Sequence, residues 1–358
     1  MPNYIEFNDK IAFHPGYYIQ EIVEDSGLTQ EDFARRLDTT PKNLSILIRG
    51  EQSLSKDIAM KLSRMLGTSI SYWLNLQKSY DTLIAEFESM EELQKEKEIL
   101  RKIDYKYFRD NFGLPDLPKK IEEQVEKLRE FLNVSTLRVF EKESLCVSFR
   151  SEGKDLSVDN IIKANMMTQI AINKALKTDA PKYNIHKFND AIKYALTLTK
   201  EHKTFYPLIK EAFMEAGVIF EILPNMPGSK INGATKKVGN NIVLMVNDRR
   251  LYSDTFWFTL FHEIGHIINK DYGITFDTDG RNKESEADVY AADALIPRDK
   301  YNRFVNAKRY GANDIRKFAD EIDRDPGIVL GRLQHDNLVG YADQQLNAIK
   351  HKYKVVLA

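Results

Sequence analysis

The sequence contains, at residues 262–266, the run His262-Glu263-Ile264-Gly265-His266. Residues four apart on a helix lie on the same face, so His262 and His266 can direct two imidazoles at one metal ion. Glu263 follows the first histidine and can act as general base toward a water molecule that the metal activates. The alternative is an ordinary helix with two surface histidines. We favour a catalytic zinc site with His262 and His266 as ligands and Glu263 as the catalytic base.

The residues around this motif predict a buried helix. Trp257, Phe261, Ile264 and Ile268 recur at helical spacing, and such an apolar stripe would pack the helix on a core and hold the ligands in place. Residues 217–224 and 241–247 predict strands, and residues 228–239 a loop or an edge hairpin. If 241–247 is an edge strand, it can bind an extended peptide by strand addition; a plain sheet strand is the alternative.

A catalytic zinc site usually has three protein ligands, so a third one is needed. Residues 283–292 predict a second helix that packs through a face of small residues, which includes Ala287 and Ala291. Glu286, next to that face, is our preferred third ligand, and Glu284 is the alternative. Exposed carboxylates are also favoured at the start of a helix, and this ordinary role fits Glu284 better than Glu286.

The remaining histidines carry weaker signals. His335 is a candidate hydrogen-bond donor to the oxyanion that develops during peptide hydrolysis, with a structural role as the alternative. His14, His186, His202 and His351 have no partner pattern in the sequence, and we assign them no role.

Residues 28–50 have the proportions of a helix-turn-helix, in which a polar turn joins two short helices. Thr29 is a good N-cap for the first helix, and Pro41 occupies the first position of the second. The second helix would then be the recognition helix, and Gln30 would contact the DNA backbone. The candidate DNA-binding residues are therefore Gln30, Lys42, Asn43, Ser45 and Arg49.

Charge limits this interpretation. The chain has 52 Lys and Arg against 53 Asp and Glu, and residues 1–80 have nine against ten. Such a balance provides little non-specific affinity for nucleic acid or for an anionic membrane. Homodimerisation, or a role in protein contact alone, is compatible with it. We still expect operator DNA as a partner.

Composition also restricts the class of protein. The single cysteine, Cys146, excludes an intramolecular disulfide and a multi-cysteine zinc site. No signal peptide and no membrane-spanning apolar run is evident, so we expect a cytoplasmic protein with no membrane partner. A chain of 358 residues exceeds one ordinary core. We expect a multidomain α+β protein: a helix-turn-helix bundle at 1–80, a mostly helical middle region at 81–200 with a strand near 137–140, and a zincin-like metallopeptidase domain with a small sheet at 201–358.

Two sets of segments resemble known families. Residues 14–16, 28–34, 48–50 and 66–77 resemble the HigA-like branch of the XRE helix-turn-helix family. Residues 233–235, 256–266, 284–288 and 295–297 resemble the ImmA/IrrE metallopeptidases, and residues 326–335 resemble the closing segment of proteins that fuse the two. The middle of the chain matches only loosely.

The resemblance implies a regulator fused to a zincin-like domain. On this interpretation the protein is a zinc-dependent endopeptidase that cleaves a protein, such as a transcriptional repressor or a cognate toxin, in a stress, mobile-element or toxin–antitoxin context. The main alternative is a DNA-binding antitoxin or repressor whose metal domain senses a ligand or binds a partner without cutting it. A purely structural zinc site is less favoured, because such sites usually have four protein ligands and the sequence offers three.

Overall fold

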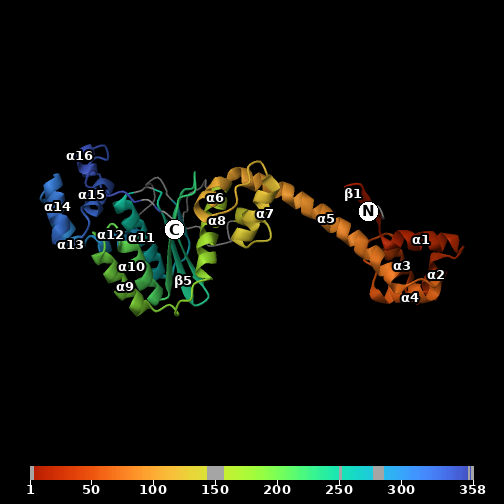
Figure 1. The fold of residues 1–358 in the computed structure, drawn as a ribbon. Helices are drawn as coiled ribbons and strands as arrows, with labels where there is room; N and C mark the ends of the chain where they lie inside the picture. The colour runs from red at the N-terminus through yellow and green to blue at the C-terminus, as the bar shows by residue number, and fades with distance from the viewer. Residues whose placement is uncertain (1–3, 143–156, 250–251, 277–285, 354, 356–358) are drawn as a thin grey trace. The chain divides into compact units, whose positions relative to one another are not determined.

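The computed structural model of the chain describes residues 4–142, 157–249, 252–276, 286–353 and 355. Cys146 and Glu284 lie outside the described residues. The chain forms two compact units, Met1–Lys95 and Glu96–Ala358, and the boundary falls within the 33-residue helix α5 (Ile70–Lys102). Figure 1 shows the elements of both units.

The first unit contains a two-stranded hairpin followed by a helical bundle. Its elements are β1 (Tyr4–Phe7), β2 (Lys10–Phe13), α1 (Pro15–Asp25), α2 (Gln30–Arg36), α3 (Pro41–Ile48), α4 (Lys56–Leu66) and the start of α5. The core includes the buried side chains of Phe33, Leu44, Leu62 and Trp73. Burial of these large apolar groups holds the short helices together, because helices of this length are marginal by themselves.

The predicted helix-turn-helix is confirmed in this unit. The Thr29 hydroxyl accepts a hydrogen bond from the Asp32 amide at the start of α2. Thr40 caps α3 in the same way, and Pro41 occupies its first turn. Asp38, in the turn between the two helices, has a φ of 53°, a left-handed conformation that aspartate tolerates better than most residues. Local capping therefore sets where both helices begin.

The second unit is built around a four-stranded sheet. Its elements are α6 (Tyr105–Phe112), α7 (Ile121–Leu132), the 3₁₀ helix η1 (Leu137–Glu141), α8 (Val158–Ala175), α9 (Ile185–Thr197), α10 (Phe205–Glu215), β3 (Val218–Leu223), β4 (Ile231–Val238), β5 (Asn241–Asn247), α11 (Ser253–Asn269), β6 (Ile274–Phe276), α12 (Glu286–Leu295), α13 (Arg298–Asn306), α14 (Ala312–Glu321), α15 (Pro326–His335) and α16 (Gln344–Asn347).

The strand order in this sheet is β3-β5-β4-β6. Strand β3 pairs with β5 in parallel, whereas β4 is antiparallel to both β5 and β6. Helix α8 lies on one side of the sheet, and α10 and α11 lie on the other (Figure 1). Helices on both faces explain why β3 and most of β5 are buried and mainly apolar, with Glu221 as the charged residue of β3.

The structure decides one alternative that the sequence left open, and it contradicts one expectation about strands. Residues 241–247 do not form an edge strand, because β5 is paired on both sides, so its backbone cannot accept a peptide by strand addition. Residues 137–140 form a 3₁₀ helix instead of a strand. Leu137 and Phe140 are fully buried and three residues apart, which is the repeat of a 3₁₀ turn. The Leu137 amide also donates to the buried carboxylate of Glu96 at 2.7 Å, a contact that no local pattern encodes.

Among the residues that the structure describes, no helix is both long and apolar enough to cross a membrane.

Candidate functional site

Helix α11 carries the histidine motif and is anchored on its apolar side, as predicted. Trp257, Phe261 and Ile264 are fully buried in the core of the second unit. Helix α11 packs against β4 and β5 of the sheet and against α12 and α15. The backbone that carries His262 and His266 is therefore held from several sides, as a ligand set of defined geometry requires.

The two motif histidines face each other. His262 Nε2 lies 3.0 Å from His266 Nε2, and the two ring centroids are 4.6 Å apart. Two nitrogens that bind one zinc ion at about 2.0–2.1 Å are roughly 3.3 Å apart at a tetrahedral angle, so the observed spacing is close to that of a shared ion. The residues present fit a zinc ion.

Each histidine is oriented by a carboxylate at its other ring nitrogen. His262 Nδ1 lies 2.6 Å from Asp288 Oδ1, and His266 Nδ1 lies 3.1 Å from Asp271 Oδ2. A carboxylate favours the tautomer with a proton on Nδ1, which leaves the Nε2 lone pair available for a metal. Sequence reasoning missed both aspartates. The motif does not point to either position by its spacing, because Asp271 lies in the loop after α11 and Asp288 lies on a separate helix, α12.

The predicted base, Glu263, is fully buried, between α11 and the sheet. A Cβ atom added to Gly233 of β4 would lie 2.7 Å from both Cγ and Oε1 of Glu263. Only glycine leaves room for the carboxylate at this distance. Gly233 is thus a positioning residue that the motif alone does not reveal.

Helix α12 approaches α11 closely at a second glycine. A Cβ atom at Gly265 would lie 3.0 Å from the Cα atom of Ala287. Ala287 and Ala291 are buried in this contact region, which confirms the predicted face of small residues. The close approach brings Asp288 within reach of His262, so the small residues contribute directly to ligand orientation.

The third ligand stays a prediction. Glu286 begins α12 and is exposed, and its Oε2 lies 3.5 Å from Asn269 Nδ2 at the end of α11. The alternative, Glu284, lies outside the described residues. The contact of Glu286 with the end of the histidine helix keeps it a candidate.

His335 also stays a prediction. It ends α15 with its side chain 58% exposed, and its Nδ1 lies 3.0 Å from Asp336 Oδ1. Among the described contacts, Asp336 also accepts a hydrogen bond from Tyr301, so His335 belongs to a polar group at the end of α15. No contact of the described residues joins it to His262 or His266.

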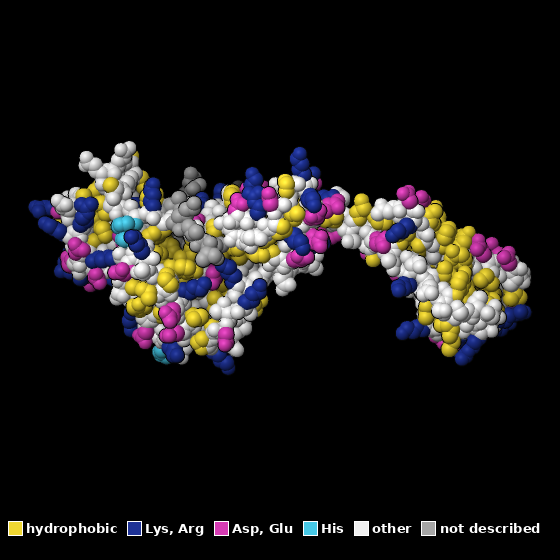
Figure 2. All heavy atoms as spheres, viewed as in Figure 1, with side chains coloured by type: hydrophobic (Ala, Val, Ile, Leu, Met, Phe, Trp, Pro, Cys, Tyr) yellow, Lys and Arg dark blue, Asp and Glu magenta, His cyan; other side chains and the backbone are white. Residues whose placement is uncertain are grey.

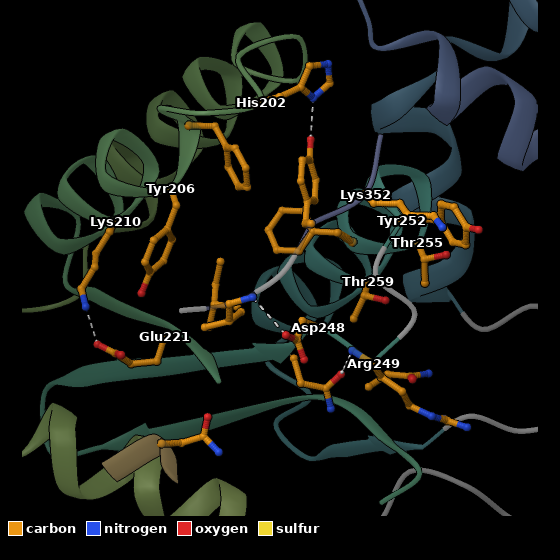
Figure 3. A pocket seen from close by; sticks show the side chains of 18 of the residues that line it. His202, Tyr206, Lys210, Glu221, Asp248, Arg249, Tyr252, Thr255, Thr259 and Lys352 are labelled. Carbon is orange, nitrogen blue, oxygen red and sulfur yellow. Dashed lines mark hydrogen bonds and ion pairs between the residues drawn. The ribbon is translucent and has the colours of Figure 1, made fainter. Parts of the chain in front are cut away.

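A pocket of about 1120 Å³ lies beside this site in the second unit. Figure 3 shows Thr255 and Thr259 of α11 among its lining residues. Thr259 precedes His262 by three residues, so the pocket follows the helix face that leads to the histidines. Across the pocket, the buried Glu221 of β3 pairs with Lys210 at 2.6 Å. The pocket thus brings polar and charged groups to the helix that carries the motif histidines.

The DNA-binding candidates divide into two groups. Gln30 and Lys42 are exposed. Asn43, Ser45 and Arg49 form hydrogen bonds to other side chains of the first unit. Asn43 is half-buried: its Nδ2 donates to Thr39 at 2.9 Å, and its Oδ1 accepts from Gln52 at 2.7 Å.

Arg49 forms an intramolecular pair, because its Nε and one terminal nitrogen donate to the two Glu51 oxygens at 2.7 and 2.9 Å. Its other terminal nitrogen donates to Ser45 at 2.5 Å. The hydrogen bond from Arg49 lowers the pKa of Glu51. Arg49 and Ser45 are thus engaged in contacts within the first unit, and their role in DNA binding stays a prediction.

Residues 19–73 match the helix-turn-helix family model, and residues 218–323 match a peptidase family model described as the IrrE N-terminal-like domain. The chain is 37% identical over 79 residues to the uncharacterized HTH-type transcriptional regulator YddM of Escherichia coli, which covers 84% of that protein and 22% of this chain. The chain belongs to the helix-turn-helix regulators. Its second unit carries the IrrE N-terminal-like domain, and the matched range includes the histidine motif and α12.

Other relatives of this helix-turn-helix protein match the same N-terminal part. Virulence-associated protein I of Dichelobacter nodosus is 31% identical over 80 residues, which cover 74% of that protein and 22% of this chain. A putative antidote protein of a plasmid maintenance system from Nostoc punctiforme is 32% identical, with 24% of this chain and 92% of that chain covered and a TM-score of 0.23. PA4674 of Pseudomonas aeruginosa, solved in complex with its operator DNA, is 26% identical, with 24% and 90% covered and a TM-score of 0.22.

Proposed function

We propose that this protein is a zinc-dependent endopeptidase joined to a DNA-binding helix-turn-helix, and that it regulates transcription by cleaving a protein such as a repressor. One observation carries the proposal. The Nε2 atoms of His262 and His266 lie 3.0 Å apart, close to the spacing of two ligands of one zinc ion, and the buried Glu263 lies on the same helix.

Different residues of the chain would carry out different steps of peptide hydrolysis. His262, His266 and Glu286 would hold the zinc ion, which when bound polarises a carbonyl group and makes water more acidic. Glu263 would accept the proton of the attacking water and pass it to the leaving amine. Asp288 and Asp271 would keep the two imidazoles in the metal-binding tautomer. His335 would donate to the developing oxyanion if the bound substrate brings it to the site.

The pocket beside α11 supports a protein substrate. Thr255 and Thr259 lie on the helix face that leads to the histidines, and Asn232 lies next to Gly233 on β4. These groups can form hydrogen bonds with a peptide backbone that approaches along the helix. The size of the pocket allows several side chains to enter at once.

The first unit would direct the protein to DNA. The helix-turn-helix match and the regulators that share this part of the chain support operator binding through α3. Lys42 and Arg49 would contact phosphates or base edges. The near-neutral charge of residues 1–80 implies that a dimer, or a strongly preferred sequence, is needed for tight binding.

The decisive experiment measures cleavage of proteins encoded beside this one by the purified full chain with zinc, together with the zinc content by mass spectrometry. We expect a discrete cut that Glu263→Gln abolishes while zinc is retained. The matched control is Glu211→Gln, an exposed glutamate on α10.

The His262→Ala/His266→Ala variant should lose one zinc ion relative to the wild type. Equal zinc content in these two proteins would refute the metal site. If zinc binds at these histidines but nothing is cut, the protein is a DNA-binding regulator whose metal domain senses or binds a partner.

A further inference from the structure

A second group of metal-ligand side chains lies in the same unit, away from the motif histidines. His202 follows α9, Asp325 precedes α15, and His351 stands near the C-terminus. One ligand atom of each lies within 4.8 Å of those of the other two. All three residues fall outside residues 218–323, the part that matches the IrrE N-terminal-like domain. The peptidase proposal uses none of them.

The geometry is that of ligands around one ion. His202 Nε2 lies 3.3 Å and His351 Nδ1 lies 3.4 Å from the same oxygen, Asp325 Oδ2. Donor atoms at about 2.0–2.2 Å from one zinc ion are separated by roughly 3.0–3.5 Å. The two rings are stacked, with centroids 3.5 Å apart, so the two imidazoles lie next to each other at the carboxylate.

The carboxylate is placed by the fold. Asp325 is fully buried, and its Oδ1 accepts hydrogen bonds from the Gly327 amide at 2.9 Å and from the Ser253 hydroxyl at 3.1 Å. These bonds cap α15 through Oδ1, so the other oxygen, Oδ2, can bind a different partner. Oδ2 is buried and has no hydrogen-bond partner among the described residues. A buried carboxylate oxygen of this kind normally has a partner.

The imidazole of His202 also has a partner at its other ring nitrogen. His202 Nδ1 lies 2.8 Å from the Tyr353 hydroxyl. Both residues line the pocket of Figure 3, in which His202 is labelled. The hydroxyl oxygen can accept a hydrogen bond from the Nδ1–H group, which leaves the lone pair on Nε2, the nitrogen that lies 3.3 Å from Asp325 Oδ2. An outer partner of this kind is the usual support of a metal-binding histidine.

Electrostatics favours a cation at this position. The carboxylate of Asp325 is fully buried, and a buried charge costs free energy unless it is paired. A divalent cation would neutralise the carboxylate and use the imidazole lone pairs.

We propose that His202, Asp325 and His351 bind a divalent transition metal, with zinc as the best match to two imidazoles and one carboxylate. The site is separate from the motif histidines. It links residues 351–353 to the start of α11, because the Ser253 amide that begins this helix donates to the His351 carbonyl at 2.8 Å. Metal binding there stabilises the C-terminal segment and the helix that carries the motif.

The test uses the full chain with His262→Ala/His266→Ala, so that zinc at the motif does not contribute. Calorimetric titration with zinc should show one binding event per chain in this background. Adding His351→Ala, at a side chain that is 50% exposed, should weaken this event by more than the roughly 10–100-fold that loss of an outer partner causes. Cobalt in place of zinc should give visible absorption bands that disappear in the same variant.

The matched control is His186→Ala, an exposed histidine on α9, which should leave the titration unchanged. Asp325→Asn serves as a second variant, because its amide oxygen can still cap α15 while the ligand charge is lost. Circular dichroism confirms the fold of each variant. Absence of zinc binding in the motif-deleted background, or binding that survives both His351→Ala and Asp325→Asn, would overturn the proposal. Neither result depends on peptidase activity.

Discussion

Gly233 of β4 lies against the side chain of Glu263 so closely that a Cβ atom there would stand 2.7 Å from the Glu263 Cγ and Oε1 atoms. The sheet therefore determines where the carboxylate can lie. The histidines on α11 are oriented separately, by Asp271 and by Asp288. Base position and metal binding are thus controlled by different contacts, so the two can be separated by mutation.

Gly233→Ala tests the first of these contacts. The added methyl group displaces the Glu263 carboxylate, and a shift of about 1 Å at a catalytic group can lower the rate about 100-fold. We expect cleavage to fall by this order while zinc affinity stays near that of the wild type. Gly340→Ala, whose added Cβ atom meets open space, is the control and should behave as wild type. Unchanged cleavage in Gly233→Ala would show that β4 does not position Glu263.

Asp288→Asn tests the second contact. The amide cannot hold the His262 tautomer as the carboxylate does, and loss of such a partner weakens metal binding by roughly 10–100-fold. We expect this loss in a competition titration with a zinc chelator. Asp293→Asn is the matched control, because Asp293 lies on the same helix and pairs with Arg298 at the surface. Equal zinc affinity of both variants would exclude a role for Asp288 in ligand orientation.

Mutation can decide whether Glu286 or Glu284 is the third zinc ligand. We expect Glu286→Gln to weaken zinc binding by more than about 100-fold, because it removes a charged ligand rather than an outer partner. Glu284→Gln should then have little effect. The same chelator competition, with the fold checked by circular dichroism, measures both variants. The opposite ranking would assign the ligand to Glu284.

The Arg49–Glu51 ion pair is expected to lower the affinity for DNA, because it competes for the Arg49 guanidinium. Glu51 holds the guanidinium through two hydrogen bonds, at 2.7 and 2.9 Å. Glu51→Gln releases Arg49 and removes a negative charge, so we expect tighter binding to upstream DNA. Arg49→Gln should weaken binding roughly tenfold or more. Fluorescence anisotropy over a range of salt concentrations measures both effects, with Arg64→Gln on α4 as the control. Identical affinities for all three variants would exclude α3 as the recognition helix.

His14 makes the first unit sensitive to acid. Its Nδ1 accepts the Gly16 amide hydrogen at 3.0 Å at the start of α1, and burial lowers its pKa, with Asp81 and the Gln52 backbone opposing. Only the unfolded chain then takes up a proton just below the ordinary histidine pKa of about 6.5. Stability is therefore complete above that pH and falls as the pH drops from there toward the lower pKa of the folded state.

We expect the free energy of unfolding of residues 15–66 to be lower at about pH 5.5 than at about pH 7.5. Hydrogen exchange of the amides in these helices measures this difference within the full chain. In His14→Asn, which keeps a capping oxygen but does not titrate, the difference should shrink. A pH dependence unchanged in His14→Asn would assign it to another group.

Features encoded by neighbouring residues could be predicted. The helix that carries His262 and His266, the buried stripe with Trp257, and the small face of α12 follow from side chains three or four positions apart. The helix-turn-helix follows from the caps Thr29 and Thr40 and from a short polar turn. These patterns depend on the local geometry of a helix, so a single sequence contains them.

Contacts between distant segments could not be predicted in the same way. The strand at 241–247 was interior and not at the edge because β3 and β4 flank it, and pairing partners are not local. Gly233 meets Glu263, and Asp325 meets His202 and His351, only because the sheet and the C-terminal segment bring them together. The sequence alone therefore determined which side chains could bind metal on one helix. The tertiary structure decided which carboxylates orient them, because proximity across a fold depends on packing rather than on residue spacing.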